Sequence, residues 1–370
     1  MFLHNISRNI KITAIALAAI VPLQSQACTS AIVSGKITLD GRPIIWKHRD
    51  TSASDNFLHR VEREGKIGYV GLFNGADSLC LDEAWMGMND EGFAIINTVA
   101  YNLPENDPDF ADREGYVMAL ALETCRTVDD FRQLLTNLPK PMGVRTNFGV
   151  LDADGNAAYF ETDDYNFEVF DLADEPSGIM IRTNFAYSGT PDDGMGYIRH
   201  QNVEDLLKNH IKTASLLPVN FTDGLSRAYY NSLTGFDADE CSDSWVVDQD
   251  FIPRHSSTAS IAIQGVKKGE DADNMIMWAN VAYPPCTYTV PVKLHCIPAA
   301  VDAIAPDNAH CEMALDARER MLKVFPVTRG SGPRYIHMDE ARSINEEMYL
   351  KSLESYSSAA DSASRESQDR

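Results

Sequence analysis

The sequence places Cys28 directly after a segment typical of a secretory leader. Two basic residues near the start precede an apolar run over residues 12–23, and Ser25 and Ala27 are the small residues that signal peptidase favours. Cleavage after Ala27 would free the α-amine of Cys28, and the reference pKa of such an amine, about 7.7 to 8.0, leaves part of it uncharged near neutral pH. The sequence therefore predicts a thiol nucleophile and a general base within one residue.

Two other interpretations of Cys28 stay open at this point. It could be the first residue of a strand without any chemistry. It could also carry a lipid, although a lipoprotein signal normally has an aliphatic residue three positions before the cysteine, where this chain has Ser25.

The segments that follow resemble a known family. "CTSAIV" and, after a short connection, "DGRPIIWKHRD" are similar to the opening of the N-terminal-nucleophile (Ntn) cysteine amidohydrolases. These include the choloylglycine hydrolases, the penicillin V acylases and the acyl-coenzyme A:6-aminopenicillanic acid acyltransferases. The resemblance implies that Asp50 bonds to the nucleophile and its amine. Lys47 stands where relatives usually carry Arg. A lysine there keeps the positive charge that favours the thiolate form of the cysteine, but it lacks the planar guanidinium group of arginine. Arg49 is the alternative candidate for the position of the family arginine.

Two further blocks carry candidate amides. "GMNDEGFAIIN" is similar to a family turn and strand, which makes Asn89 a turn residue and gives Asn97 a place in the oxyanion hole. "RTNF" occurs twice, and only the second copy follows the "DADG" hairpin as in the family. Asn184 is therefore the expected oxyanion donor, a role typically worth a few kcal/mol of barrier, whereas Asn147 is expected to be structural.

Arg199 corresponds to an arginine at the start of the next helix in these enzymes, where it supports the active site, with a surface salt bridge as the competing interpretation. The resemblance runs from Cys28 to about residue 290. It implies no cofactor. The sequence also predicts no metal site, because Cys296, His310 and Cys311 do not have the spacing of a zinc motif.

Composition limits the partners. The formal charge of −22 becomes −24 when a leader with two basic and no acidic residues is removed, which argues against nucleic acid as a partner. The apolar run before Cys28 is shorter than the roughly 20 residues that cross a bilayer, so no stable membrane insertion is expected. An odd number of cysteines, 7, leaves at least one unpaired thiol and fits one reserved for chemistry.

The elements that must position these residues alternate irregularly along the chain. Strands are predicted at residues 29–33, 43–46, 67–73, 93–99, 148–152, 157–161 and 179–183, and again in the C-terminal third. Helices are predicted at 115–125, 127–138, 196–210 and 223–233, the second with Thr127 as its N-cap. This order predicts an α+β protein, and the family resemblance implies a four-layer αββα sandwich of two antiparallel sheets.

The sequence thus predicts three segments: a signal peptide over residues 1–27, a single Ntn-hydrolase domain over 28–350, and a disordered tail over 351–370. The expected activity is hydrolysis of a linear, non-peptide amide in the periplasm or outside the cell, with a small acyl-amide as substrate. Alternatives are a dipeptidase, an acyltransferase, or a non-catalytic lipid-anchored protein on the same fold. Bile salts, penicillin V, N-acyl amino acids and acyl homoserine lactones are not distinguished, and a homo-oligomer is one open arrangement.

Overall fold

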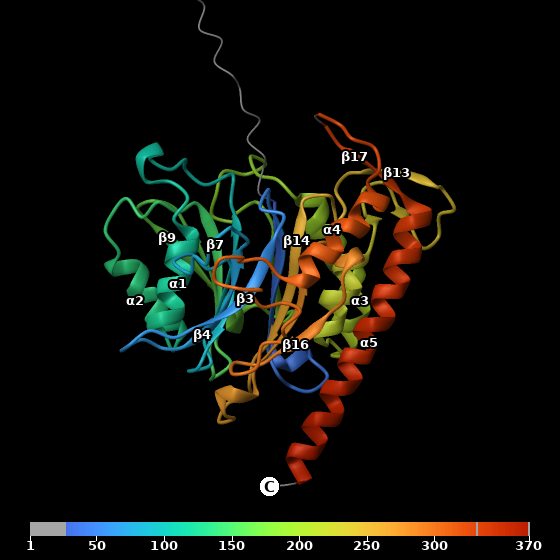
Figure 1. Cartoon of the computed structure of the whole chain (residues 1–370). Coiled ribbons are helices and arrows are strands. Elements are labelled where there is room, and N and C mark those ends of the chain that lie inside the picture. The colour runs from blue at the N-terminus through green and yellow to red at the C-terminus, as the bar shows by residue number, and fades with distance from the viewer. Residues whose placement is uncertain (1–26, 331, 369–370) are drawn as a thin grey trace, which may run out of the picture.

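The computed structural model describes residues 27–330 and 332–368, with side chains described up to residue 359 (Figure 1). The predicted leader therefore lies outside the described residues, except for Ala27. Among the described residues, no helix combines the length and the hydrophobicity needed to cross a bilayer.

One sheet carries the N-terminal hairpin. Its six antiparallel strands follow the order β10 (Ile179–Arg182), β1 (Thr29–Val33), β2 (Ile44–Asp50), β14 (Ser257–Gln264), β15 (Ile276–Val281) and β16 (Val290–Val292). The strands predicted at residues 29–33 and 43–46 are β1 and β2, which pair as an antiparallel hairpin with Ala31 opposite Trp46. Because β10 pairs with β1, the segment after β10 lies beside Cys28.

The other sheet is an antiparallel meander of seven strands. They are β3 (Asn56–Val61), β4 (Tyr69–Asn74), β5 (Gly87–Asn89), β6 (Ala94–Val99), β7 (Thr146–Leu151), β8 (Ala157–Thr162) and β9 (Phe167–Asp171). The hairpin predicted around "DADG" is the β7–β8 connection. Strand β3 lies in a stretch for which the sequence analysis predicts neither a strand nor a helix.

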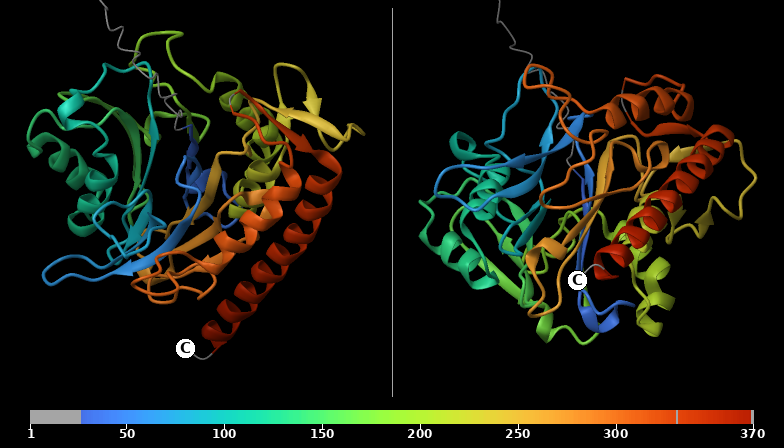
Figure 2. Two further views of the ribbon diagram at one scale, coloured as in Figure 1. Left: turned by 45° about the horizontal axis from the view of Figure 1, so that its top comes forward. Right: turned by 60° about the horizontal axis from the view of Figure 1, so that its bottom comes forward.

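Helices cover the two outer surfaces of the sheets. Helices α1 (Glu114–Thr124) and α2 (Val128–Asn137) lie against the seven-stranded sheet, and α3 (Tyr197–Thr213), α4 (Glu312–Val324) and α5 (Met338–Gln368) lie on the side of the six-stranded sheet (Figures 1 and 2). Strands β1 and β2 contact β6 and β7 across the middle. The structure confirms an α+β fold of four layers, with two antiparallel sheets between helices.

Short elements complete the chain. They are two small sheets, β11 (Tyr230–Asn231) with β12 (Phe236–Asp237) and β13 (Trp245–Asp248) with β17 (Arg334–His337), a π-helical turn η4 (Asn220–Gly224), and the 3-10 turns η1 (Gly35–Ile37), η2 (Pro108–Phe110), η3 (Leu172–Asp174), η5 (Leu225–Arg227), η6 (Ala272–Asn274) and η7 (Pro284–Cys286). The helix predicted over residues 223–233 is wrong, because η4 and η5 end at Arg227 and strand β11 follows.

Strand alternation divides the apolar residues of the hairpin between two cores. Ile32 and Ile45 point into the core between the sheets, whereas Ala31, Ile44 and Trp46 point to the core beneath α3 and η4. The six-stranded sheet is therefore buried on both faces. The same alternation decides where the polar residues at the upper end of β2 point.

A local sequence motif determines the start of α2, whereas tertiary packing determines how far α5 extends. Thr127 caps α2 as predicted: its side chain accepts from Asp130 N, and the Asp130 carboxylate accepts from Thr127 N, which completes a capping box. The disordered tail predicted from residue 351 is wrong for most of its length, because α5 continues to Gln368. Tyr356 stacks on Trp278 with ring centroids 4.5 Å apart and donates to Asp223, so tertiary packing stabilises a stretch whose composition is polar.

Candidate active site

The predicted nucleophile lies at the upper end of the β1–β2 hairpin. Cys28 is 5% exposed. In the β1–β2 register Thr29 is opposite His48 and Ser30 is opposite Lys47, so Lys47 and Arg49 share the inner face of the sheet with Ser30. The charge of Cys28 opposes the lowering of the pKa of Lys47, Arg49 and Arg199, so all three cations lie within electrostatic range of this residue.

Cys28, Asn184 and Arg199 form one hydrogen-bonded group. Cys28 N donates to Asn184 Oδ1 at 3.1 Å. Arg199 Nη1 donates to Cys28 O at 2.6 Å and to Thr29 Oγ1 at 2.8 Å, and Nη2 donates to Asn184 Oδ1 at 2.6 Å. Arg199 is 1% exposed, so it is a buried cation within the site rather than a partner in a surface salt bridge. Here Cys28 N is a peptide nitrogen, and it stands where the α-amine would be after cleavage.

The orientation of the Asn184 amide follows from its partners. Cys28 N and Arg199 are both donors, so the side-chain oxygen must face them. Asn184 Nδ2 donates to Val99 O at 2.9 Å, and Tyr101 N donates to Asn184 O at 3.2 Å. The end of β6 in one sheet therefore helps to hold an asparagine that follows β10 in the other sheet.

Lys47 and Asn97 form a second buried pair. Lys47 Nζ donates to Asn97 Oδ1 at 2.6 Å and to Trp85 O at 2.9 Å, and Asn97 Nδ2 donates to Thr146 Oγ1 at 3.2 Å. Burial lowers the pKa of Lys47 to about 7, and the charge of Cys28 opposes that shift. Lys47 is therefore a cation that can lose its proton near neutral pH. The predicted amide and the predicted cation are brought together.

Arg49, the alternative to Lys47, is also buried. Burial lowers its pKa to about 10, so it remains charged at neutral pH, with Cys28 opposing the shift. Its guanidinium lies 4.7 Å from the centre of the Trp85 ring and donates to Asn56. Two cations, rather than one, thus stand on the inner face of β2.

The structure gives Asp50 different partners from those that the resemblance implies. Asp50 Oδ1 accepts from Ser257 Oγ at 2.6 Å, and Oδ2 pairs with Arg254 Nε at 3.1 Å. The physical reason is strand alternation, because Asp50 shares the outer face of β2 with His48, opposite to Lys47. The expected bond from Asp50 to Cys28 is thus replaced by bonds to the segment before β14 in the described part of the chain.

Sequence reasoning missed three titratable groups around the predicted site residues. Burial raises the pKa of Tyr101 to about 12, with the charge of Cys28 acting in the same direction, so this hydroxyl stays protonated. Burial raises the pKa of Glu114 to about 7. Arg254 reaches Asp50 from a loop more than two hundred residues away along the chain. Tyr101 follows the Asn97 strand closely and could have been noticed, whereas the other two carry no local signal.

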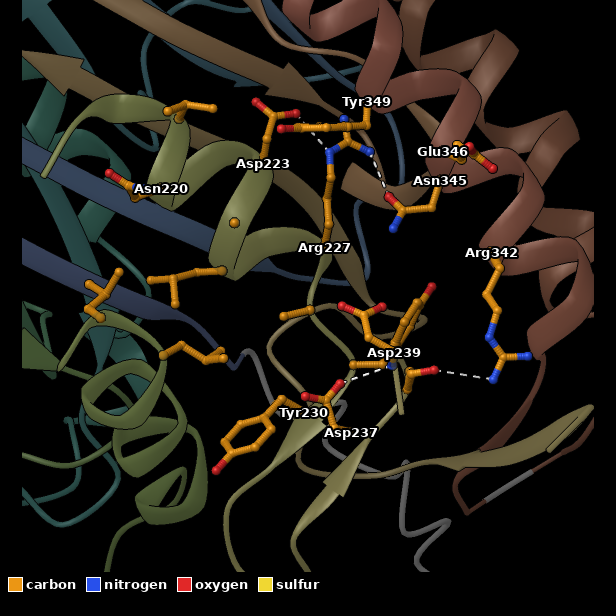
Figure 3. Close-up of a pocket in the computed structure, with 18 of the residues that line it drawn as sticks. Asn220, Asp223, Arg227, Tyr230, Asp237, Asp239, Arg342, Asn345, Glu346 and Tyr349 are labelled. Atoms are coloured by element: carbon orange, nitrogen blue, oxygen red, sulfur yellow. Dashed lines mark hydrogen bonds and ion pairs between the residues drawn. The ribbon is translucent and has the colours of Figure 1, made fainter. Parts of the chain in front are cut away.

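A pocket of about 610 Å³ lies elsewhere, between α3, η4, η5, β12 and α5 (Figure 3). The described residues that line it include none of the six predicted site residues. Arg227 at its wall donates to Asp223 at 2.8 Å, to two backbone carbonyls and to Asn345, and Figure 3 shows it pointing toward Asp223 and Asn345. These bonds connect η5 to α5 and give the buried charges of Arg227 and Asp223 a structural role.

Comparison with known proteins gives similarity of fold alone. No protein-family model and no curated protein matches the sequence. Similar solved structures include a mutant conjugated bile acid hydrolase from Clostridium perfringens, with 13% identity over 72% of this chain and 92% of that chain and a TM-score of 0.44. Penicillin V acylase from Agrobacterium tumefaciens has 12% identity over 72% of this chain and 86% of that chain, with a TM-score of 0.40. An N-acylethanolamine-hydrolyzing acid amidase ortholog from Caenorhabditis elegans has 14% identity over 64% of this chain and 92% of that chain, with a TM-score of 0.39.

Proposed function

We propose that this protein is an exported hydrolase of small linear amides that uses the thiol of Cys28 after cleavage at residue 27. The observation that carries the proposal is the convergence of Cys28 N and Arg199 on Asn184 Oδ1. A mature α-amine at the position of Cys28 N would donate to Asn184 and keep its lone pair for the thiol proton. The nearby guanidinium disfavours a second positive charge and so favours the neutral amine.

The reaction then runs in two steps. The amine takes the thiol proton, the thiolate attacks the amide carbon, and Asn184 Nδ2 donates to the oxyanion. Collapse breaks the carbon–nitrogen bond, the proton passes from the amine to the leaving nitrogen, and a thioester remains. Water, deprotonated by the same amine, attacks the thioester and releases a carboxylic acid and the thiol. Lys47 and Arg49 stabilise the thiolate, and Arg199 and Lys47 orient the two asparagine amides.

The test uses purified protein that begins at Cys28, together with the Cys28→Ser variant. Both are given a panel of bile-salt, penicillin V, N-acyl amino acid and acyl homoserine lactone amides. We expect release of free amine by the parent protein and at least a hundredfold lower rate in Cys28→Ser. Intact-mass spectrometry of the quenched reaction should show an acyl adduct on the peptide that begins at Cys28.

The outcomes separate the alternatives. Equal rates in the two proteins would contradict a thiol nucleophile. Transfer of the acyl group to an added amine would identify an acyltransferase, and cleavage of dipeptides alone would identify a dipeptidase. Protein recovered from the producing cell with a lipid on Cys28 would rule out the proposed chemistry, because an acylated residue has neither the free thiol nor the free amine.

A further inference from the structure

We infer that Asn147 and Glu161 are positioning residues that together hold Asn184 at Cys28. This inference rests on the proposed function, in which Asn184 acts on the oxyanion. The two residues lie directly opposite each other on β7 and β8, in the register Asn147↔Glu161. Both are buried, and both reach from the seven-stranded sheet to the segment 183–188, which continues β10 of the six-stranded sheet.

Asn147 holds the backbone on both sides of Asn184. Its Nδ2 donates to Thr183 O at 3.3 Å and to Phe185 O at 3.1 Å, and also to Thr98 Oγ1 at 3.0 Å. The residue before Asn184 and the residue after it are therefore bound by the same side-chain amide. The first "RTNF" copy thus orients the second copy.

Glu161 binds the backbone of the same segment at Tyr187 and Ser188. Its Oε1 accepts from Tyr187 N at 3.0 Å, and its Oε2 accepts from Ser188 N at 2.7 Å and from Ser188 Oγ at 2.6 Å. Arg182 Nε donates to Oε1 at 2.7 Å, so the same carboxylate binds the last residue of β10 and the segment beyond Asn184.

The Glu161–Arg182 ion pair is buried, and its contacts indicate that it fixes the position of the backbone rather than adding stability. Both side chains are at most 2% exposed. The Arg182 guanidinium lies 3.8 Å from the centre of the Tyr187 ring and 4.9 Å from that of Tyr159, and it donates to Ile181 O at 3.0 Å. A buried ion pair is not an efficient source of stability, because desolvation offsets the attraction. Fixing one backbone path between the sheets is a role that an apolar contact would not perform.

The consequence for Asn184 follows from its partners. Its Oδ1 must meet Cys28 N on β1's side while its Nδ2 meets Val99 O at the end of β6. These partners belong to different sheets, so a shift of the segment 183–188 would lengthen one of the two bonds. A displacement of about 1 Å is enough to reduce the rate of a positioned reaction by roughly a hundredfold.

The experiment uses Glu161→Gln and Asn147→Asp, which keep the size of each side chain. Glu161→Gln removes the charge, and Asn147→Asp sets a carboxylate against two carbonyl oxygens. Glu168→Gln and Asn166→Asp are matched controls: Glu168 lies opposite Glu161 on β9, and both controls are exposed. Ser188→Ala, which removes one bond to Glu161, is the milder variant if Glu161→Gln does not fold.

The readouts are kcat and KM on the best amide of the panel, the alkylation rate of Cys28, and backbone hydrogen exchange of the peptide covering residues 183–190. We expect a 10- to 100-fold lower kcat with KM within about threefold, unchanged alkylation, and faster exchange in this peptide. The controls should match the parent protein. Unchanged kcat with faster exchange would overturn the positioning role, and unchanged exchange would overturn the contact itself. If the parent protein hydrolyses no amide, the proposed function fails, and hydrogen exchange alone then decides for or against the bonds to segment 183–188.

Discussion

Arg199 binds the main chain of the predicted nucleophile: its Nη1 donates to Cys28 O at 2.6 Å. The same guanidinium donates to Asn184, so one buried side chain fixes the nucleophile and the amide that faces it. The fork geometry of arginine is what permits both bonds, because an ammonium group is a single point of charge. The first residue of a mature chain would otherwise be free to move.

Replacing Arg199 with Lys should therefore lower kcat/KM about a hundredfold, which corresponds to about 2.7 kcal/mol of transition-state stabilisation. Steady-state kinetics on the best amide of the panel measures the effect. Lys208→Met on the exposed side of the same helix is the control and should leave kcat/KM unchanged. Wild-type kinetics in Arg199→Lys would show that the guanidinium is dispensable.

Lys47 should make stability depend on pH. Its folded pKa of about 7 lies below the unfolded value of 10.5, so the folded state releases a proton that the unfolded state keeps between these values. The penalty for burying the charge is complete below pH 7, falls as the pH rises through this window, and is absent above 10.5. The full change is at most about 5 kcal/mol, since one pKa unit corresponds to about 1.4 kcal/mol.

Urea unfolding of the parent protein and of Lys47→Met at pH 6, 8 and 10 tests this relationship. The variant should gain stability relative to the parent as the pH is lowered, because methionine carries no charge to bury. A stability difference that is constant from pH 6 to pH 10 would contradict a lowered pKa for Lys47.

Removal of residue 27 should activate the thiol. A protein that begins at Ala27 keeps Cys28 N as a peptide nitrogen, which cannot accept a proton, whereas a protein that begins at Cys28 has an amine. We expect iodoacetamide to alkylate the second form at least tenfold faster at pH 7.5 and only this form to hydrolyse amides. Equal activity of the two forms would mean that a different group is the base.

The docking of the C-terminal helix α5 should depend on the hydroxyl group of Tyr356. Its hydroxyl donates to Asp223 at 3.1 Å and contacts Thr222 Oγ1 at 2.6 Å, so Tyr356→Phe should lower the free energy of unfolding by about 1 kcal/mol. Thermal or urea unfolding measures the change. Tyr349→Phe, on an exposed position of α5, is the control, and equal stability of both variants would mean that this part of α5 does not dock.

Much of the fold was predictable because its signals are local. The β-branched, apolar composition of residues 29–33 and the turn signal "DADG" before residues 157–161 predict strands, and Thr127 predicts the start of α2. The helix expected at 223–233 and the disordered tail failed for the opposite reason. Bonds to distant groups, such as those that tie Arg227 and Tyr356 to other segments, decide the conformation there.

The sequence by itself determined the chemistry that is available: a cysteine after a leader-like segment, two cations near the end of the second strand, and amides in two separate motifs. Only the tertiary structure decided how they meet. Strand alternation turns Asp50 away from Lys47, and the packing of two sheets brings Val99 and Asn147 to a segment of the other sheet. These contacts join residues far apart in the chain, so no local pattern encodes them.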